Sequence, residues 1–273
     1  RNLNLNNPIL LTEKIQWLKL YDYPKNELVI QAADKYTLKE YLNNKKLSKY
    51  ATDYLFVISN PTEIFIKELP GKFVMKKTNS SGLNLIVKDK DLITETFLRN
   101  KATEWLKIDF GTVTMEKHYT AAKDRIMFEP YFILGNEYRI FCIGGKPRFF
   151  QIVVWDWEND TKESSSLNET IEGHAHHTRI HLSLDWEVTW IEDEKMNRNV
   201  PEPLFKDEMI KVASSIAVDF ELIRVDFQVI DDKLKIGELT LTPGSGFIDY
   251  LDSELDLELG SLINISKIQK KRS

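Results

Sequence analysis

Apolar and polar residues alternate with a period of two between residues 223 and 229. The apolar positions are Ile223, Val225, Phe227 and Val229, and the polar positions are Arg224, Asp226 and Gln228. This period predicts a β-strand with one face packed against the protein core. The polar stretch Asp231-Asp232-Lys233 follows it and predicts a hairpin loop, with the return strand running toward Thr240.

The length of this loop decides which side chains share a face. A three-residue loop centred on Asp232 places Asp226 opposite Glu238 and Arg224 opposite Thr240. A two-residue loop would send the two carboxylates to opposite faces, because a slip of one residue turns every side chain over. We predict the three-residue loop.

The predicted shared face carries groups that suit a divalent cation. The neighbouring carboxylates of Asp226 and Glu238 repel each other unless a cation lies between them. Mg²⁺ prefers such hard oxygen ligands and shares them with nucleotide phosphate. Arg224 lies on the same face, where it could hold an anionic reaction centre. Pro243-Gly244-Ser245-Gly246 predicts a tight turn whose N–H groups suit an acyl oxygen or a phosphate. The alternative is an amphipathic hairpin with a solvated polar face.

Further strands are predicted upstream of this hairpin. Residues 54–58 read as a short strand, and residues 73–78 and 84–87 as a hairpin around Ser80-Ser81-Gly82, whose small residues leave amides that can cover phosphates. An exposed hairpin tip is the alternative for that loop. Residues 137–154 predict two strands around Gly144-Gly145.

Helical patterns alternate with these strands. Thr12 is predicted to cap a first helix and Asp34 a second one. The other predicted helices cover residues 63–69, 91–107 and 205–217, the last with an apolar stripe of Met209, Val212, Ala213 and Ile216. We expect residues 109–123 to be irregular, residues 155–178 to form a long loop, residues 184–188 to form a strand and residues 261–273 to form a solvated tail.

Composition narrows the functional classes. Of the 273 residues 42% are hydrophobic, which is enough for a proper core, and the net charge of −5 argues against a sequence-independent nucleic-acid binder. The single cysteine, Cys142, excludes an intramolecular disulfide and, in its apolar surroundings, is expected to be a buried structural thiol.

No apolar run is long enough for a transmembrane segment and no secretory signal is visible, so a cytoplasmic location is expected. The sequence starts with Arg1 rather than Met, so trimming at that end stays open.

Four of the five histidines lie close together. They are His174, His176, His177 and His181. Their spacing raises the hypothesis of a zinc site, but no cysteine or convincing fourth ligand stands nearby. A surface strand, or a segment facing a bound molecule, is the favoured interpretation.

Several motifs in order resemble one known family. They are Glu13–Tyr21, Ala33–Tyr36, Leu69–Lys76, Ser80–Gly82, Phe128–Tyr131 and the hairpin with Arg224-Val-Asp226 and Gly237-Glu238-Leu-Thr240-Leu-Thr-Pro243-Gly244. Together they resemble the TupA-like branch of the ATP-grasp superfamily, which is associated with teichuronopeptide and bacterial surface-polysaccharide biosynthesis. Each motif alone is weak, and the set covers nearly the whole chain.

The resemblance implies an α+β fold of the ATP-grasp type, with nucleotide and Mg²⁺ between two lobes. On this basis we expect a helical lead-in over residues 1–50, in which the ATP-grasp region starts. A smaller lobe that covers the nucleotide should span residues 51–133, and a larger lobe with the metal and substrate site should span residues 134–273.

The resemblance also assigns residues to the nucleotide. They are Lys35, Lys76, Ser81, Gly82, Glu129, Tyr131, Phe132 and Glu137. The two lysines would contact phosphates and Ser81 and Gly82 would cover them. Glu129 and the backbone of Tyr131 and Phe132 would face adenine, and Glu137 the ribose. Without the resemblance, Lys35 would read as an exposed lysine and the two glutamates as strand-end carboxylates.

The implied reaction is ligation of a carboxylate to an amine through an acylphosphate, at the cost of ATP. Asp226, Glu238 and Thr240 would hold Mg²⁺. Many amide-forming members have Asn where Thr240 stands, so a single metal or altered chemistry is possible. Arg224 and Arg139 would act on the anionic reaction centre, with an edge ion pair as the alternative for Arg139.

By its branch, the implied acceptor is a uronic-acid or amino-acid carboxylate on a small molecule or glycan, and a polysaccharide-assembly complex is a possible partner. The alternatives are an ATP-grasp kinase acting on a sugar hydroxyl and a nucleotide-binding module without turnover.

Overall fold

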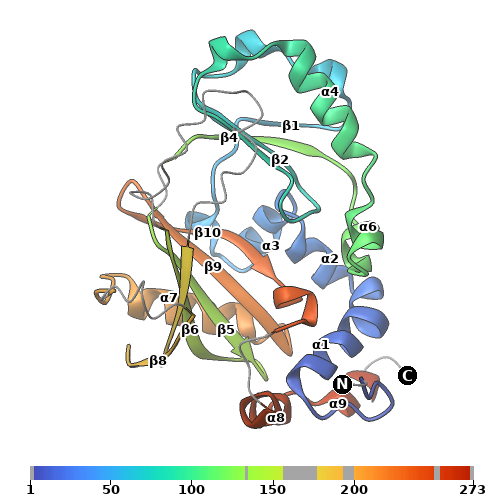
Figure 1. The fold of residues 1–273 in the computed structure, drawn as a ribbon, viewed down its shortest axis with the longest axis vertical. Helices are drawn as coiled ribbons and strands as arrows, with labels where there is room; N and C mark the ends of the chain where they lie inside the picture. The colour runs from blue at the N-terminus through green and yellow to red at the C-terminus, as the bar shows by residue number, and fades with distance from the viewer. Residues whose placement is uncertain (1–2, 133–134, 156–176, 193–199, 249–252, 271–273) are drawn as a thin grey trace.

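The computed structural model describes residues 3–132, 135–155, 177–192, 200–248 and 253–270. Two antiparallel sheets and the helices around them make up the fold (Figure 1). The described strands and helices confirm the predicted α+β class. No helix among the described residues is long and apolar enough to cross a membrane.

The smaller sheet has four strands in the order β1-β4-β2-β3. They are β1 (Phe56–Ile58), β2 (Phe73–Lys77), β3 (Asn84–Val87) and β4 (Ile126–Pro130). Helix α4 (Glu95–Leu106) packs on this sheet, and Trp105 shares a buried core with Phe73 and Phe128. The hairpin predicted at residues 73–78 and 84–87 is therefore confirmed, with β2 paired to β3 in antiparallel register.

The larger sheet has six strands in the order β10-β9-β5-β6-β7-β8. They are β5 (Glu137–Ile143), β6 (Lys146–Trp155), β7 (His177–Leu182), β8 (Val188–Ile191), β9 (Leu222–Ile230) and β10 (Lys233–Thr240). Helix α7 (Lys206–Ala217) covers one face (Figure 1), and its predicted stripe of Met209, Val212, Ala213 and Ile216 is buried. The other face keeps the polar residues of the strands.

The hairpin of β9 and β10 has the predicted pairing but reaches it differently. Asp226 pairs with Glu238 and Arg224 with Thr240, as predicted. The predicted three-residue loop is wrong: Lys233 pairs with Ile230, so the loop has only Asp231 and Asp232, both with positive φ (48° and 58°). A bulge at Gly237 then restores the shared face by adding one residue to β10.

Three helices precede the first strand and pack on the core of the larger sheet. They are α1 (Leu11–Trp17), α2 (Glu27–Ala33) and α3 (Leu38–Asn44). Thr12 is not the cap of α1, because the helix starts one residue earlier and Thr12 Oγ1 donates a 2.7 Å hydrogen bond to Asp256. Instead, the carboxylate of Glu13 accepts hydrogen bonds from the N–H groups of Ile9 and Leu10, just before the helix.

Asp34 acts differently from the predicted cap as well. The helix that follows it, α3, has Thr37 at its cap position. The Asp34 carboxylate accepts hydrogen bonds from the N–H groups of Tyr36 and Thr37 and from the hydroxyl of Thr78. It therefore joins the turn between α2 and α3 to the end of β2, and so orients Lys35.

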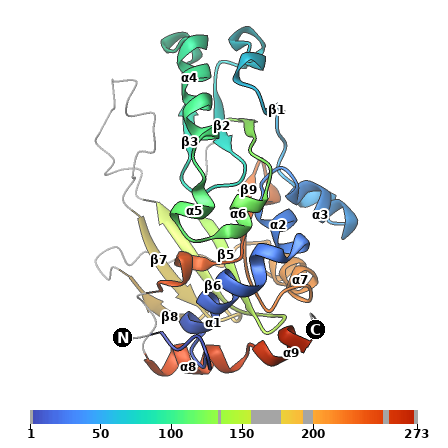
Figure 2. The ribbon, with the colours of Figure 1, turned by 90° about the vertical axis from the view of Figure 1, so that its right-hand side faces the viewer.

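The C-terminal part is more ordered than its sequence suggested. Residues 253–270 contain α8 (Ser253–Ser261) and α9 (Ile265–Lys270), which lie beside α1 in both views of the ribbon (Figures 1 and 2). Ile263 and Ile265 are buried in the larger core, so the prediction of a solvated tail is wrong for residues 261–268. Of the leucines of α8, Leu259 is buried in the same core, and Lys14 donates to the carbonyls of Gly260 and Ile263.

Other boundaries differ where short elements replace long ones. Residues 63–69 hold parts of two 3-10 turns rather than a helix, and α4 starts at Glu95 rather than at residue 91 because Thr94 caps it. The region expected to be irregular contains α5 (Phe110–Val113) and α6 (Lys117–Ala121). Residues 184–186 form a turn before β8. Residues 156–176, in the predicted long loop, lie outside the described residues.

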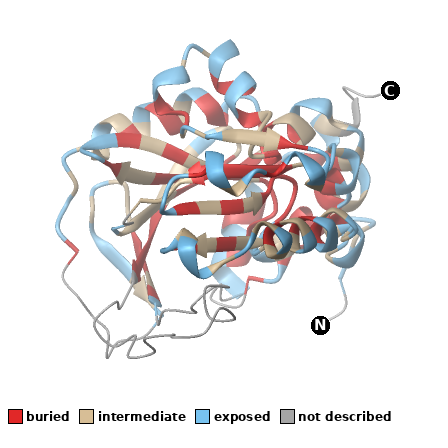
Figure 3. Ribbon diagram, turned by 90° about the horizontal axis from the view of Figure 1, so that it is seen from above, coloured by how far each residue is buried: buried red, intermediate tan, exposed pale blue. Residues whose placement is uncertain are grey.

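Buried side chains of the described residues include two hydrophobic clusters, one with strands of each sheet. Buried positions occur on both the strands and the helices (Figure 3). The helices α1, α2 and α3 contribute to the cluster of the larger sheet. Cys142 is 1% exposed within it, and burial raises the pKa of its thiol, which fits a structural role. The expected division at residues 50 and 133 stays a prediction.

Replacing Gly260 tests the contact between the C-terminal helices and α1. A Cβ at Gly260 would lie 2.3 Å from the Ile9 carbonyl oxygen and 2.6 Å from the Leu11 nitrogen, which are backbone atoms that cannot rotate away. We expect Gly260→Ala to lower the free energy of unfolding by about 1–3 kcal/mol in urea denaturation. Gly71→Ala is the control, because nothing lies within 4 Å of its Cβ position. Equal stability of both variants would contradict the packing of this segment.

Candidate active site

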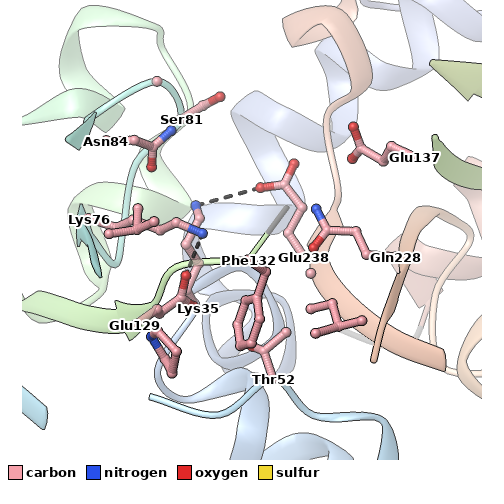
Figure 4. Close-up of a pocket in the computed structure, with 15 residues that line it drawn as sticks. Lys35, Thr52, Lys76, Ser81, Asn84, Glu129, Phe132, Glu137, Gln228 and Glu238 are labelled. Carbon is pink, nitrogen blue, oxygen red and sulfur yellow. Dashed lines mark ion pairs between the residues drawn. The ribbon is translucent and has the colours of Figure 1, made fainter. Parts of the chain in front are cut away.

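A cavity of about 310 Å³ lies between the two sheets. The smaller sheet contributes Lys76, Asn84 and Glu129, and the larger sheet contributes Gln228 and Glu238 (Figure 4). The full lining is Lys35, Thr52, Val74, Lys76, Ser81, Gly82, Asn84, Glu129, Pro130, Phe132, Glu137, Gln228, Ile230, Gly237 and Glu238. Eight of the predicted site residues are therefore brought together from distant parts of the chain.

Two lysines face this cavity, each beside a carboxylate. Lys76 Nζ lies 2.5 Å from Glu129 Oε2, and Lys35 Nζ lies 3.6 Å from Glu238 Oε2 (Figure 4). Lys35 also donates to the carbonyl of Ser80, in the loop between β2 and β3. Lys77 points to the opposite face of β2 and is buried against the carbonyls of Trp105 and Ile108. Lys35 and Lys76 both line the cavity and could therefore contact an anion bound in it.

The predicted metal ligands lie together on the polar face of β9 and β10. Thr240 Oγ1 is 3.3 Å from Asp226 Oδ2 and 3.1 Å from Glu238 Oε1, so the two carboxylates converge on one hydroxyl. Arg224 donates two hydrogen bonds to Asp226, from Nε to Oδ1 at 2.7 Å and from Nη2 to Oδ2 at 2.5 Å. Its Nη2 also lies 3.6 Å from Glu238 Oε1. A guanidinium therefore compensates the paired acids in this structure.

The two acids differ in exposure and in their pKa. Asp226 is 1% exposed, and burial raises its pKa, with the charges of Arg224 and Arg139 acting in the opposite direction. Burial also disfavours the ionised form of Glu238, but Lys35, Arg224 and Arg139 outweigh this and lower its pKa to about 2. The side chain of Glu238 is 34% exposed and lines the cavity. Glu238 is thus an ionised oxygen donor at neutral pH.

This donor set fits a magnesium ion. Two carboxylates and a hydroxyl supply hard oxygen atoms, which is the ligand type that Mg²⁺ prefers. Arg224 and Lys35 place positive charge beside the acids, so cationic side chains balance the negative charge of the pair in this structure. No group of three or more His, Cys, Asp or Glu residues suited to a metal occurs in the described ranges, so a site here relies on two acids with water and phosphate.

Arg139 extends the same face on β5. Its Nη2 forms a 2.9 Å ion pair with Glu137, which is the edge pair that the sequence left as an alternative. Its Nε lies 4.0 Å from Asp226 Oδ2 and, among the described residues, has no hydrogen-bond partner although it is buried. Arg139 therefore keeps an N–H donor directed toward Asp226.

The predicted glycine-rich turn forms next to this face but does not line the cavity. Gly244, Ser245 and Gly246 all have positive φ (57°, 53° and 80°), which makes the chain turn sharply after β10. Lys19 donates to the carbonyl and the hydroxyl of Ser245, and Gln16 donates to the same carbonyl. Lys19 is 2% exposed, and burial lowers its pKa, with Glu116 acting in the opposite direction. Sequence reasoning gave Lys19 and Gln16 no role.

The residues predicted for the adenine side are only partly at the cavity. Glu129 and Phe132 line it, as do Ser81 and Gly82 on the opposite loop, whereas Tyr131 does not. Gln228, Asn84 and Thr52 were missed. The alternation along β9 could have identified Gln228, because it lies two residues beyond Asp226 and so shares its face.

The histidine segment is only partly within the described structure. His174 and His176 lie outside the described residues, and the zinc hypothesis stays untested for them. His181 lies in β7, is 5% exposed, and has its Nε2 2.8 Å from the side-chain nitrogen of Gln151.

Comparison with solved structures identifies the class of fold. An L-amino acid ligase from Bacillus licheniformis is similar with a TM-score of 0.50 and 13% identity, over 96% of this chain and 54% of that one. The D-alanyl-alanine synthetase A from Vibrio cholerae gives a TM-score of 0.49 and 16% identity, over 90% of this chain and 65% of that one. This chain thus spans between about half and two thirds of their length. The arrangement is the ATP-grasp fold.

The family follows from the sequence itself. The chain belongs to the TupA-like ATP-grasp family, whose model matches residues 13–264. No curated protein matches the sequence significantly.

Neutralising each acid tests the electrostatics of the site through stability. Asp226→Asn leaves the buried Arg224 without its main counter-charge, so we expect a loss of about 1–3 kcal/mol in the free energy of unfolding. Glu238→Gln should change stability less, because Glu238 is partly exposed and approaches Arg224 only at 3.6 Å. Urea denaturation of both variants measures the difference. A larger loss for Glu238→Gln would contradict this ranking.

Proposed function

We propose that this chain is an ATP- and Mg²⁺-dependent ligase that joins a carboxylate to an amine through an acylphosphate. The observation that carries this proposal is the convergence of Asp226, Glu238 and Thr240 beside a cavity that also receives Lys35 and Lys76. Membership of the TupA-like ATP-grasp family supports the same activity. Two structures of similar fold are named as an L-amino acid ligase and a D-alanyl-alanine synthetase, and both names describe bond-forming enzymes.

In this reaction the chain contributes position and charge. Lys35 and Lys76 leave their carboxylate partners to neutralise nucleotide phosphates, Ser81 and Gly82 cover the phosphates, and Glu129 and Phe132 flank the base. Glu137 binds the ribose hydroxyls. Asp226, Glu238 and Thr240 hold Mg²⁺, which supplies charge compensation at the phosphates.

Negative charge on the carboxyl and phosphoryl oxygens needs hydrogen-bond donors besides those that bind the nucleotide. Arg224 and Arg139 project from neighbouring positions of β9 and β5 and can stabilise negative charge on the carboxyl and phosphoryl oxygens. The turn at Gly244, Ser245 and Gly246, braced by Lys19, is the proposed place for the acyl group. Thr240 stands where an amide would be a stronger ligand, which favours the use of a single metal or an altered chemistry.

The acceptor that we propose is a uronic-acid or amino-acid carboxylate in bacterial surface-polysaccharide biosynthesis, within a cytoplasmic assembly complex. This finer proposal rests on the TupA-like family and on an amine and a carboxylate being the substrate types of amide ligases. Two cations and the glycine-rich turn on one face suit an acidic acceptor.

Removing the charge of Lys76 tests the phosphate site. We expect Lys76→Met to weaken ATP binding by about tenfold or more, because a charge-assisted contact to phosphate is worth about 1.5–3 kcal/mol. Isothermal titration calorimetry with a non-hydrolysable ATP analogue and Mg²⁺ measures it. Lys72→Met is the matched control, since Lys72 is an exposed lysine that directly precedes the same strand. Equal affinities would place the phosphates elsewhere.

Product analysis tests the reaction class. Amino acids and uronic-acid sugars, combined as acceptor and amine with ATP and Mg²⁺, should release ADP and phosphate only when both partners are present, with an amide detected by mass. ADP with a phosphorylated sugar and no free phosphate would indicate the kinase, and nucleotide binding without ADP would indicate the non-catalytic module.

Glu238→Gln should abolish ADP formation in the same assay while the protein stays folded, because the metal loses an ionised ligand. Asp231→Asn is the control: it removes an exposed acid from the tip of the same hairpin, at a positive φ that Asn tolerates. Full turnover of Glu238→Gln would overturn the metal assignment.

A further inference from the structure

A row of side chains crosses the larger sheet in register from one edge strand to the other. The successive Cα pairs are Glu238–Asp226, Asp226–Arg139, Arg139–Gln151, Gln151–His181 and His181–Trp190. Directly opposite residues of neighbouring strands project from the same face. The row therefore continues the candidate metal and anion site beyond Arg139, over β6 and β7 to β8. The proposed function uses it only as far as Arg139.

The hydrogen bonds within this row have a fixed direction. Arg139 Nη1 donates to Gln151 Oε1 at 3.3 Å, and Gln151 Nε2 lies 2.8 Å from His181 Nε2. A guanidinium can only donate, so Gln151 must present its carbonyl oxygen to Arg139 and its amide nitrogen to His181. His181 Nε2 must then accept, which places the imidazole proton on Nδ1.

Burial makes this direction costly to change. Gln151 is 2% exposed and His181 is 5% exposed. If two donors faced each other in this row, water could not accept their hydrogen bonds, and both donors would stay unsatisfied. Burial, with the charge of Arg179, lowers the pKa of His181 to about 4, so the ring is neutral at pH 7. A neutral ring whose Nε2 lone pair accepts a hydrogen bond is what the Gln151 amide requires.

We propose that Gln151 and His181 are positioning residues that hold the Arg139 guanidinium toward the reaction centre. Glu137 fixes Nη2 and Gln151 fixes Nη1, so the plane of the guanidinium is set and its Nε is directed to the side of Asp226. His181 prevents Gln151 from turning its amide nitrogen to Arg139. The ligand held in this way is the anionic centre itself, the transferring phosphoryl group or the carboxylate that receives it. This step rests on the proposed function, whereas the hydrogen-bond direction does not.

The tautomer of His181 tests the direction without any ligand. ¹⁵N NMR of the nucleotide-free protein at pH 7, with His181 assigned by His181→Gln, should show the Nδ1–H tautomer. Arg139→Met frees Gln151 to rotate, so the tautomer population should shift toward Nε2–H. Thr189→Val is the control, because it removes a hydrogen bond to the His181 carbonyl and leaves the row intact. An Nε2–H ring in the unchanged protein, or no shift in Arg139→Met, would overturn the inference.

The positioning role is tested by calorimetry with Mg²⁺, ADP and aluminium fluoride, which together imitate a transferring phosphoryl group. Gln151→Met should leave the affinity for Mg²⁺-ADP unchanged. The increase in affinity that aluminium fluoride causes should be about tenfold smaller in this variant. Gln151→Glu keeps an acceptor for Arg139 and should restore most of that gain. If ADP binds and the fluoride gain is the same in Gln151→Met, the positioning role is wrong. If ADP does not bind the unchanged protein, the proposed function fails instead.

Discussion

The pairing of Asp226 with Glu238 across the β9–β10 hairpin is the constraint on which the candidate site depends. A two-residue turn at Asp231 and Asp232 would by itself put these acids on opposite faces, and the bulge at Gly237 corrects this by one residue. The bulge lies against the Gln228 side chain, where a Cβ would be only 3.3 Å from the amide carbon. The Gln228 side chain could move by a few tenths of an ångström to admit a Cβ, so it is the bulge itself that lets the turn and the polar face coexist. The apolar face remains in register with α7 on the far side, so the core and the site are set by the same hairpin.

The connection between the two sheets is made by few polar contacts. Asp34 binds Thr78 at the end of β2 and the N–H groups that follow Lys35, and Lys35 in turn reaches Ser80 and Glu238. One short segment between α2 and α3 thereby touches the loop of the smaller sheet and the acids of the larger one. This explains why the residues that line one cavity are so far apart in sequence. The position of Lys35 is held by backbone contacts, and its ammonium is paired with Glu238 at the edge of the cavity.

Sequence patterns predicted the parts of the fold that obey local periodicity. The strands at residues 73–77 and 84–87 and the buried stripe of α7 followed from alternation and helical spacing. Short elements with mixed signals were missed: the turns near residues 61–68, the helices α5 and α6, and the C-terminal α9, whose Ile265 is buried in the core of the larger sheet. At the site, the paired acids could be predicted from spacing, but the bulge could not, because two local arrangements give the same pairing. Lys19 and Gln151 depend on contacts with residues more than 200 and about 30 positions away, and no local pattern reports such contacts.

The ion pairs of Lys35 with Glu238 and of Lys76 with Glu129 have a thermodynamic consequence. Under the proposed function, nucleotide phosphates would not meet free cations, because each ammonium would exchange one anion for another, so the net gain would be a difference between two attractions. If Lys35 turned to a phosphate, Glu238 would lose a neighbouring positive charge and would bind another cation more strongly. Binding of the nucleotide and of the divalent ion would then be linked, and each would raise the affinity for the other by the same factor.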